Sequence, residues 1–168
     1  MSRLKKVSFI VVGTIALSSI WVAGAQDVSG YESGPGALQV FDGDGMAATP
    51  LWVQVWIAIM LASFAAGLLF VWKQPIARWA VGGFIAPFVV GGPIYGALGW
   101  PFLSGAIALN HLIFWSPALF LLLTRRPFLS ANHSTAFRIW SGVITFVIVF
   151  SFIFDVRDAV IYLGHVLP

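Results

Sequence analysis

The chain has 168 residues, of which 60% are hydrophobic and only 9% are charged, and it contains no cysteine. Soluble domains carry about 25% charged residues, so we expect a lipid-embedded protein. The lack of cysteine excludes disulfides, thiolate metal sites, c-type haem attachment and a lipoprotein anchor. Arg3, Lys5 and Lys6 account for the formal charge of +3, because the other six basic residues balance six acidic ones. We therefore expect no nucleic-acid partner.

The first 25 residues have the three-part pattern of a secretory signal peptide. Basic residues lead into an apolar run over 7–22, and Ala23-Gly24-Ala25 supplies small residues at the cleavage position. We predict a signal peptide over 1–25 that is cleaved before Gln26. The alternative is an uncleaved first membrane helix, and both interpretations place Gln26 outside the cytoplasm.

Residues 26–50 are rich in glycine and lack the apolar periodicity of a helix. We predict an exported polar tail that is only partly ordered. Asp42-Gly43-Asp44-Gly45 is similar to the start of a calcium loop, but the further ligands and the bidentate glutamate of an EF-hand are missing. A turn with solvated carboxylates is favoured over a calcium site.

The remaining residues, 51–168, predict an all-α bundle of four transmembrane helices, since one span needs about 20 apolar residues. We expect these helices at about 51–72, 79–98, 102–124 and 136–158. The turn after the second helix is placed at Gly99-Trp100-Pro101, because proline disfavours helix at the preceding residue. Pro87 and Pro93 predict a kink or a break in the second helix.

The charged residues of this domain predict its orientation. Five basic residues fall at one set of predicted helix ends: Lys73, Arg78, Arg125, Arg126 and Arg138. The acidic residues fall at the opposite ends, with Arg157 as the basic exception. Positive residues favour the cytoplasm. We therefore predict a multi-pass protein of the bacterial cytoplasmic (inner) membrane, with the mature N- and C-termini on the periplasmic side.

Two predicted helices carry polar residues inside apolar sequence. His111 is expected roughly 13 Å into the third helix, at about 1.5 Å per residue, with Asn110 before it and Trp115 one turn further on the same face. On the last helix, spacings of 4, 3, 4 and 3 place five polar residues on one face, if the helix continues past Arg157: Ser151, Asp155, Asp158, Tyr162 and His165. Ionisable residues inside a bilayer are costly and favour a functional site with a named partner. We predict that His111 pairs with Asp155.

Two interpretations of these polar residues stay open. They form a candidate polar site, or His111 only joins two helices through a hydrogen bond while Asp155 and Asp158 are solvated among lipid headgroups. We expect no cofactor, because His133 and His165 are placed too far from His111 to share one haem. A metal site of His111, Asp155 and Asp158 lacks a second histidine and is disfavoured. The sequence contains no recognisable catalytic set.

About the last hundred residues resemble an uncharacterised group of small four-helix inner-membrane proteins of proteobacteria. Their third helix has the pattern G-H-x-x-W-x-P-L and their last helix ends in D-x-x-D-x-x-x-Y-L-x-G. The matching residues here are Asn110, His111, Trp115 and Pro117 for the first pattern, and Asp155, Asp158, Tyr162, Leu163 and Gly164 for the second. Asparagine replaces the glycine, and the spacing to the tryptophan is one residue longer. The resemblance implies the four-helix architecture and no activity.

The sequence favours a non-enzymatic membrane protein that is an accessory or assembly subunit of a larger membrane complex. Its small size, the lack of a catalytic set and the small residues Ala58, Ala62 and Ala66 on one helix face support this interpretation. The expected partners are the lipid bilayer and another membrane protein or a second copy of the chain. The alternative is a small transporter or proton-linked carrier that uses His111 and Asp155 within a broken-helix pathway.

Overall fold

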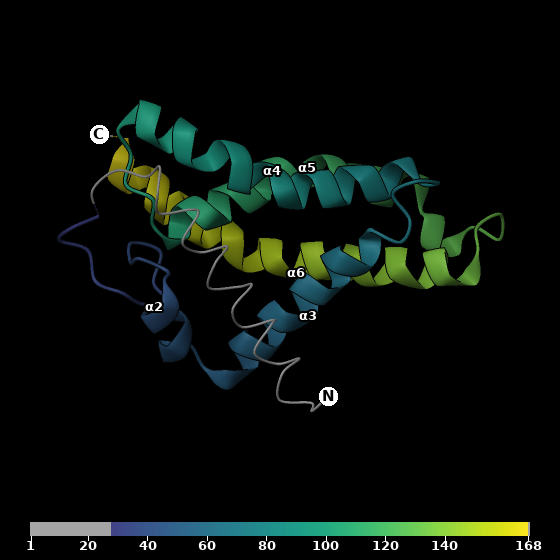
Figure 1. Ribbon diagram of the computed structural model, residues 1–168, viewed down its shortest axis with the longest axis horizontal. Coiled ribbons are helices and arrows are strands. Elements are labelled where there is room, and N and C mark those ends of the chain that lie inside the picture. The colour runs from purple at the N-terminus through teal and green to yellow at the C-terminus, as the bar shows by residue number, and fades with distance from the viewer. Residues whose placement is uncertain (1–27, 168) are drawn as a thin grey trace, which may run out of the picture.

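The computed structural model describes residues 28–167, so the predicted signal peptide over 1–25 lies outside the described residues. The helices are α2 (Gly43–Ala48), α3 (Leu51–Gly67), α4 (Pro75–Leu98), α5 (Ser104–Arg125), the 3₁₀ helix η1 (Pro127–Leu129) and α6 (Thr135–Val166). Figure 1 shows α4, α5 and α6 lying side by side, with α3 crossing them obliquely. The predicted all-α fold is confirmed for this part of the chain.

Three helices of the described chain, α4, α5 and α6, are long and apolar enough to cross a membrane. The apolar helix α3 has 17 residues, a length of about 25 Å at about 1.5 Å per residue. The hydrocarbon core of a bilayer is about 30 Å thick. A membrane-embedded protein therefore follows from the three long helices, and α3 is at the lower limit of a span.

Helix α3 ends earlier than its predicted boundary near Trp72. After Gly67 the backbone changes to tighter i→i+3 hydrogen bonds, in which the amide of Phe70 donates to the Gly67 carbonyl at 2.9 Å. The guanidinium of Arg78 then donates to the carbonyl oxygens of Val71 and Trp72 at 2.7 and 3.1 Å. A cation that satisfies terminal carbonyls stabilises such a helix end.

Helix α4 begins at Pro75, earlier than predicted, because proline fits the first helical position, where no amide donor is needed. Pro87 and Pro93 do not break it, since the helix is continuous to Leu98. Figure 1 shows that its axis bends instead. The predicted turn follows, where Gly99 takes the left-handed conformation with φ 71°.

Helices α5 and α6 form an antiparallel pair. α5 covers nearly its predicted range, whereas α6 has 32 residues and extends well past the predicted end near residue 158. Its first turn is capped by the Ser134 hydroxyl, which accepts a hydrogen bond from the Phe137 amide at 3.3 Å. At about 1.5 Å per residue α6 is about 48 Å long, so it exceeds the thickness of the hydrocarbon core.

Residues 28–50 form a folded cap in the structure, whereas the sequence predicts a polar tail that is only partly ordered. The amide of Gly105 donates to the Ala37 carbonyl at 2.8 Å, and the amide of Ser104 donates to the Gln39 carbonyl at 2.9 Å. The apolar side chains of Val28, Tyr31, Leu38 and Val40 pack against the ends of the long helices. These apolar contacts hold the cap despite its many glycines.

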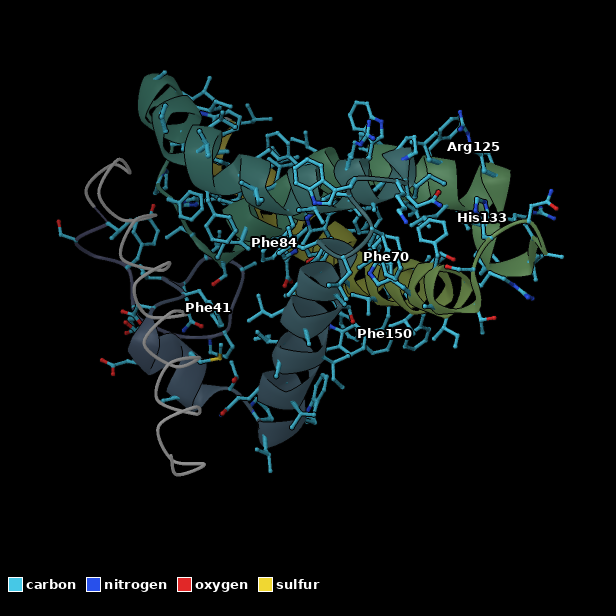
Figure 2. The ribbon with its side chains drawn as sticks, turned by 45° about the vertical axis from the view of Figure 1, so that its right-hand side comes forward. Phe41, Phe70, Phe84, Arg125, His133 and Phe150 are labelled. Carbon is cyan, nitrogen blue, oxygen red and sulfur yellow. The ribbon has the colours of Figure 1, made fainter. Side chains whose placement is uncertain are left out.

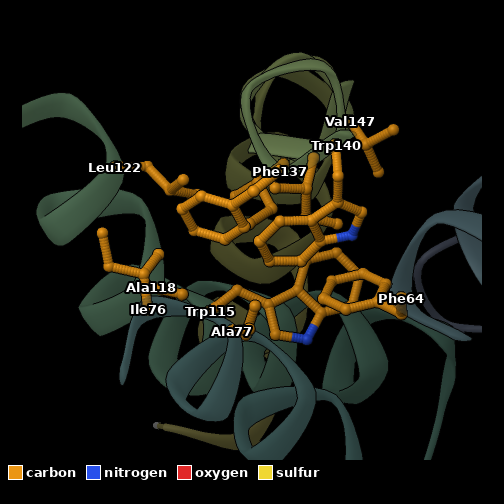
Figure 3. Packing of buried hydrophobic residues seen from close by; sticks show 12 residues of the cluster. Phe64, Ile76, Ala77, Trp115, Ala118, Leu122, Phe137, Trp140 and Val147 are labelled. Carbon is orange, nitrogen blue, oxygen red and sulfur yellow. The ribbon is translucent and has the colours of Figure 1, made fainter. Parts of the chain in front are cut away.

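Two clusters of buried side chains lie at opposite ends of the bundle. The first joins α3, α4, α5 and α6 and includes Phe64, Trp115, Phe137 and Trp140, as Figure 3 shows. The second lies under the cap and is built from Tyr95, Phe102, Leu103, Ala106 and Tyr162. Figure 2 shows Arg125 and His133 at one end of the molecule and Phe41 of the cap at the other.

Gly83 sets the distance between α4 and α5. It is buried, and a Cβ atom at this position would overlap the backbone carbonyl oxygen of Phe114. A backbone atom cannot move aside as the end of a flexible side chain can, so the two helices would have to separate. The neighbouring Gly82 is exposed and has open space at its Cβ position.

We predict that Gly83→Ala destabilises the protein by about 2 kcal/mol, the usual cost of overpacking a core. The midpoint of thermal unfolding in detergent, followed by tryptophan fluorescence, should fall by about 4–8 °C. Gly82→Ala is the matched control and should leave that midpoint unchanged or raise it slightly. Equal midpoints for the two variants would show that the close approach of α4 and α5 at Gly83 does not limit the thermal stability of the protein.

Candidate functional site

His111 of α5 and Asp155 of α6 form an ion pair or hydrogen bond between the two helices. The imidazole Nδ1 lies 3.2 Å from the carboxylate Oδ2 of Asp155. The side chains are 20% and 14% exposed, respectively, so each is largely removed from solvent. The two residues paired by sequence reasoning are therefore in direct contact.

The imidazole of His111 is also fixed by an aromatic contact. It stacks on the indole of Trp115 one turn further along α5, with ring centroids 3.9 Å apart and ring planes at 17°. Trp115 is 1% exposed, and the Phe64 ring of α3 packs on it with centroids 4.7 Å apart. Stacking on a buried indole limits the orientations that the imidazole can adopt.

The pair lines a crevice with a volume of about 370 Å³. Its walls come from the cap, α3, α4, α5 and α6, and the larger apolar side chains among them are Phe41, Met46, Met60, Phe84, Phe88, Phe102 and Trp115. The crevice lies between α3 and the other three long helices, where Figure 1 shows α3 diverging from them. Small-molecule sites typically enclose about 300–1,000 Å³ and have mostly apolar walls.

The inner end of the crevice is closed by aromatic rings. Phe64 stacks on Phe84 with centroids 4.8 Å apart and ring planes at 18°, and it also contacts Trp115. Both Phe84 and Trp115 line the crevice, whereas Phe64 is 1% exposed in the core beyond it. In this structure the crevice therefore ends within the bundle.

Asp158 is the third ionisable residue of the crevice. It is half-buried one turn beyond Asp155 on α6 and lines the same space. Asp155 has His111 as its partner, whereas the described residues provide Asp158 with no hydrogen bond or ion pair. The adjacent Arg157 is exposed and lies on a different face of the helix.

The other predicted site residues have different surroundings. Asn110 is 3% exposed and faces α4, where its Oδ1 lies 3.4 Å from the Tyr95 hydroxyl. Tyr162 is buried under the cap and donates a hydrogen bond to the Pro101 carbonyl at 2.8 Å. The Ser151 hydroxyl is buried without a hydrogen-bond partner in the described chain. The structure thus brings His111, Trp115, Asp155 and Asp158 together at the crevice. Asn110, Tyr162 and Ser151 lie apart from them.

The roof of the crevice is a feature that sequence reasoning missed. Phe41 and Met46 of the cap line the crevice, and the cap is tied to the end of α6 by Tyr31, whose hydroxyl lies 2.8 Å from His165 Nε2. The available signal was the presence of apolar residues at intervals in the glycine-rich segment. These residues lack a helix or strand period, so their burial was not predicted.

The Asp42-Gly43-Asp44-Gly45 sequence forms a helix cap. Asp42 Oδ1 accepts a hydrogen bond from the Gly45 amide, and Oδ2 accepts one from the Ser33 hydroxyl, each at 2.8 Å. These bonds lower the pKa of Asp42 below its usual value of 3.8. Oδ1 therefore caps α2 and Oδ2 is engaged by Ser33. No group of three or more potential metal-binding acidic or histidine side chains occurs in 28–167.

Comparisons with protein-family models, curated proteins and solved structures found no match for this chain. The resemblance to small proteobacterial membrane proteins therefore remains a prediction.

We predict that Asp42→Ala loosens α2 and so the roof of the crevice. Loss of a side-chain N-cap costs about 1 kcal/mol, so hydrogen–deuterium exchange of the Gly45 and Met46 amides should become about five-fold faster at neutral pH. Asp44→Ala is the control, because Asp44 is exposed and is not the capping residue.

The pH dependence of this effect follows from the lowered pKa of Asp42. The stabilisation should be complete above the ordinary carboxyl pKa of 3.8 and should be lost as the pH falls through the lower pKa of the folded state. Wild type and Asp42→Ala should then exchange alike in strong acid. A difference that persisted there would contradict the role of the ionised carboxylate.

Proposed function

We propose that the protein is a non-enzymatic integral membrane protein of the bacterial inner membrane, and that it serves as an accessory or assembly subunit of a larger membrane complex. In this role, the crevice is the site at which the protein itself binds a ligand. The observation that carries this proposal is the closed inner end of the crevice at Phe64, Phe84 and Trp115. A polar site whose inner end is filled by packed aromatic rings is suited to binding and not to passage.

The proposed topology has α3 as a fourth span and both mature termini on the periplasmic side, after removal of 1–25. Two observations support it. Lys73, Arg78, Arg125 and Arg138 belong to helix ends and connections that lie opposite the cap, and positive residues favour the cytoplasm. The mostly apolar exposed faces of α3 and the long helices fit contact with lipid or with a partner helix.

A small proton-linked carrier is the second candidate, and the His111–Asp155 contact favours it. Histidine serves as a proton shuttle in many proteins, and intramembrane ionisable pairs mark proton pathways in many transporters. A carrier also requires a state in which a route leads from the crevice to the opposite side of the membrane. The first cluster of buried side chains fills that route with large aromatic residues, including Phe137 and Trp140.

Two measurements on the same preparation test the proposal. Native mass spectrometry of protein extracted from its own membrane in mild detergent should find it in a stoichiometric assembly with other membrane subunits. Purified protein reconstituted in vesicles with an enclosed pH dye should add no proton flux to that of protein-free vesicles. His111→Ala should change neither result, since the proposed role involves no proton transfer.

The matched control is His133→Ala, because His133 lies in the connection between η1 and α6, outside the crevice. The proposal is overturned if the protein is extracted without partner subunits and a flux appears that His111→Ala abolishes and His133→Ala preserves. That outcome would establish the carrier function instead.

A further inference from the structure

The ionisable residues that line the crevice have an excess of negative charge. They are His111, Asp155 and Asp158, and neither lysine nor arginine is among the lining residues. Two carboxyl groups therefore line this space together with one imidazole. A ligand of positive charge would complement the acidic side of this balance.

Asp158 is placed to receive that charge. His111 already contacts Asp155, whereas Asp158 borders the crevice without a hydrogen-bond or ion-pair partner in the described chain. A half-buried carboxylate without a partner loses hydration free energy. A cationic group bound in the crevice would compensate for the lost hydration free energy.

The remaining walls of the crevice are suited to an apolar body. Phe84, Phe88 and Trp115 lie on two different helices around the space, and Met46 and Met60 close it from the cap and α3. Methionine adapts its shape to irregular ligands, and aromatic faces attract organic cations. A hydrated inorganic cation would find few oxygen ligands on these walls.

We propose that the crevice binds a small amphiphilic monocation, an organic ammonium group on an apolar body, with Asp158 as its counter-ion. This inference rests on the proposed binding role of the crevice. The ammonium group contacts Asp158 near the cap, and the apolar body extends toward Phe84 and Trp115. The ligand is a free small molecule, which the following experiment distinguishes from a lipid headgroup.

The test compares three probes that share one apolar body: 4-phenylbutylamine, 4-phenylbutan-1-ol and 4-phenylbutyrate. Binding to the full chain is measured by isothermal titration calorimetry in phosphatidylcholine nanodiscs, and protein-free nanodiscs correct for partition into lipid. We expect the ammonium probe to bind at least ten-fold more tightly than the alcohol or the carboxylate, because only the ammonium compensates the carboxylates.

Variants identify the residue that supplies the charge. Asp158→Asn should weaken binding of the amine at least ten-fold, Asp158→Glu should retain most of it, and both should leave binding of the alcohol unchanged. Asp44→Asn is the matched control, because Asp44 is exposed on α2 and does not line the crevice. His111→Gln leaves both carboxyl groups of the crevice in place and should not weaken binding of the amine, so the inference stays testable if Asp158→Asn does not fold.

The outcomes separate this inference from the proposed function. Equal affinities for the amine and the alcohol, unchanged by Asp158→Asn, would overturn the cationic ligand and leave the crevice as an apolar binding site. Binding of none of the probes would contradict the binding role of the crevice as well. If phosphatidylethanolamine in the nanodiscs displaces the amine in an Asp158-dependent manner, the ammonium group belongs to a lipid and the small-molecule ligand is overturned.

Discussion

The contact between His111 and Asp155 is the constraint around which the surrounding structure is arranged. Two ionisable side chains within membrane-spanning helices are stable only if they pair with one another and keep some access to water or to a polar ligand. The 3.2 Å contact provides the pairing, and the crevice provides the access. The stacked indole of Trp115 holds the imidazole at the height on α5 where the carboxylate of α6 can meet it.

This constraint explains why the buried side chains form two clusters. The cluster around Phe64 and Trp140 holds the ends of the helices that lie opposite the cap, and the cluster around Tyr95 and Tyr162 holds the ends beneath the cap. The polar pair lies between them, where close apolar packing would leave its charges unsolvated. The cap provides apolar contacts that the second cluster could not obtain from four helices of unequal length.

The sequence predicted the features that depend on local pattern. The long apolar helices, the turn at Gly99 and the pairing of His111 with Asp155 follow from hydropathy, proline chemistry and helical spacing. The folding of the cap was not predicted, because it depends on backbone bonds from Ser104 and Gly105 to residues more than 60 positions earlier. Asn110 was grouped with its neighbour His111, yet adjacent residues of a helix point about 100° apart, and Asn110 faces α4.

The placement of α3 connects the fold to the proposed ligand. The Trp140 indole donates to the Ser63 carbonyl at 3.0 Å, and a Cβ atom at Gly67 would lie 2.9 Å from the Val81 side chain, so this end of α3 is held against both α6 and α4. Nearer its start, Trp56 packs on Phe150 of α6 with ring centroids 4.4 Å apart, while the side toward α4 borders the crevice. A helix fixed at one end and against one neighbour leaves a wedge-shaped space on its other side. The size of the site is therefore set by the angle of α3, and its charge by α5 and α6.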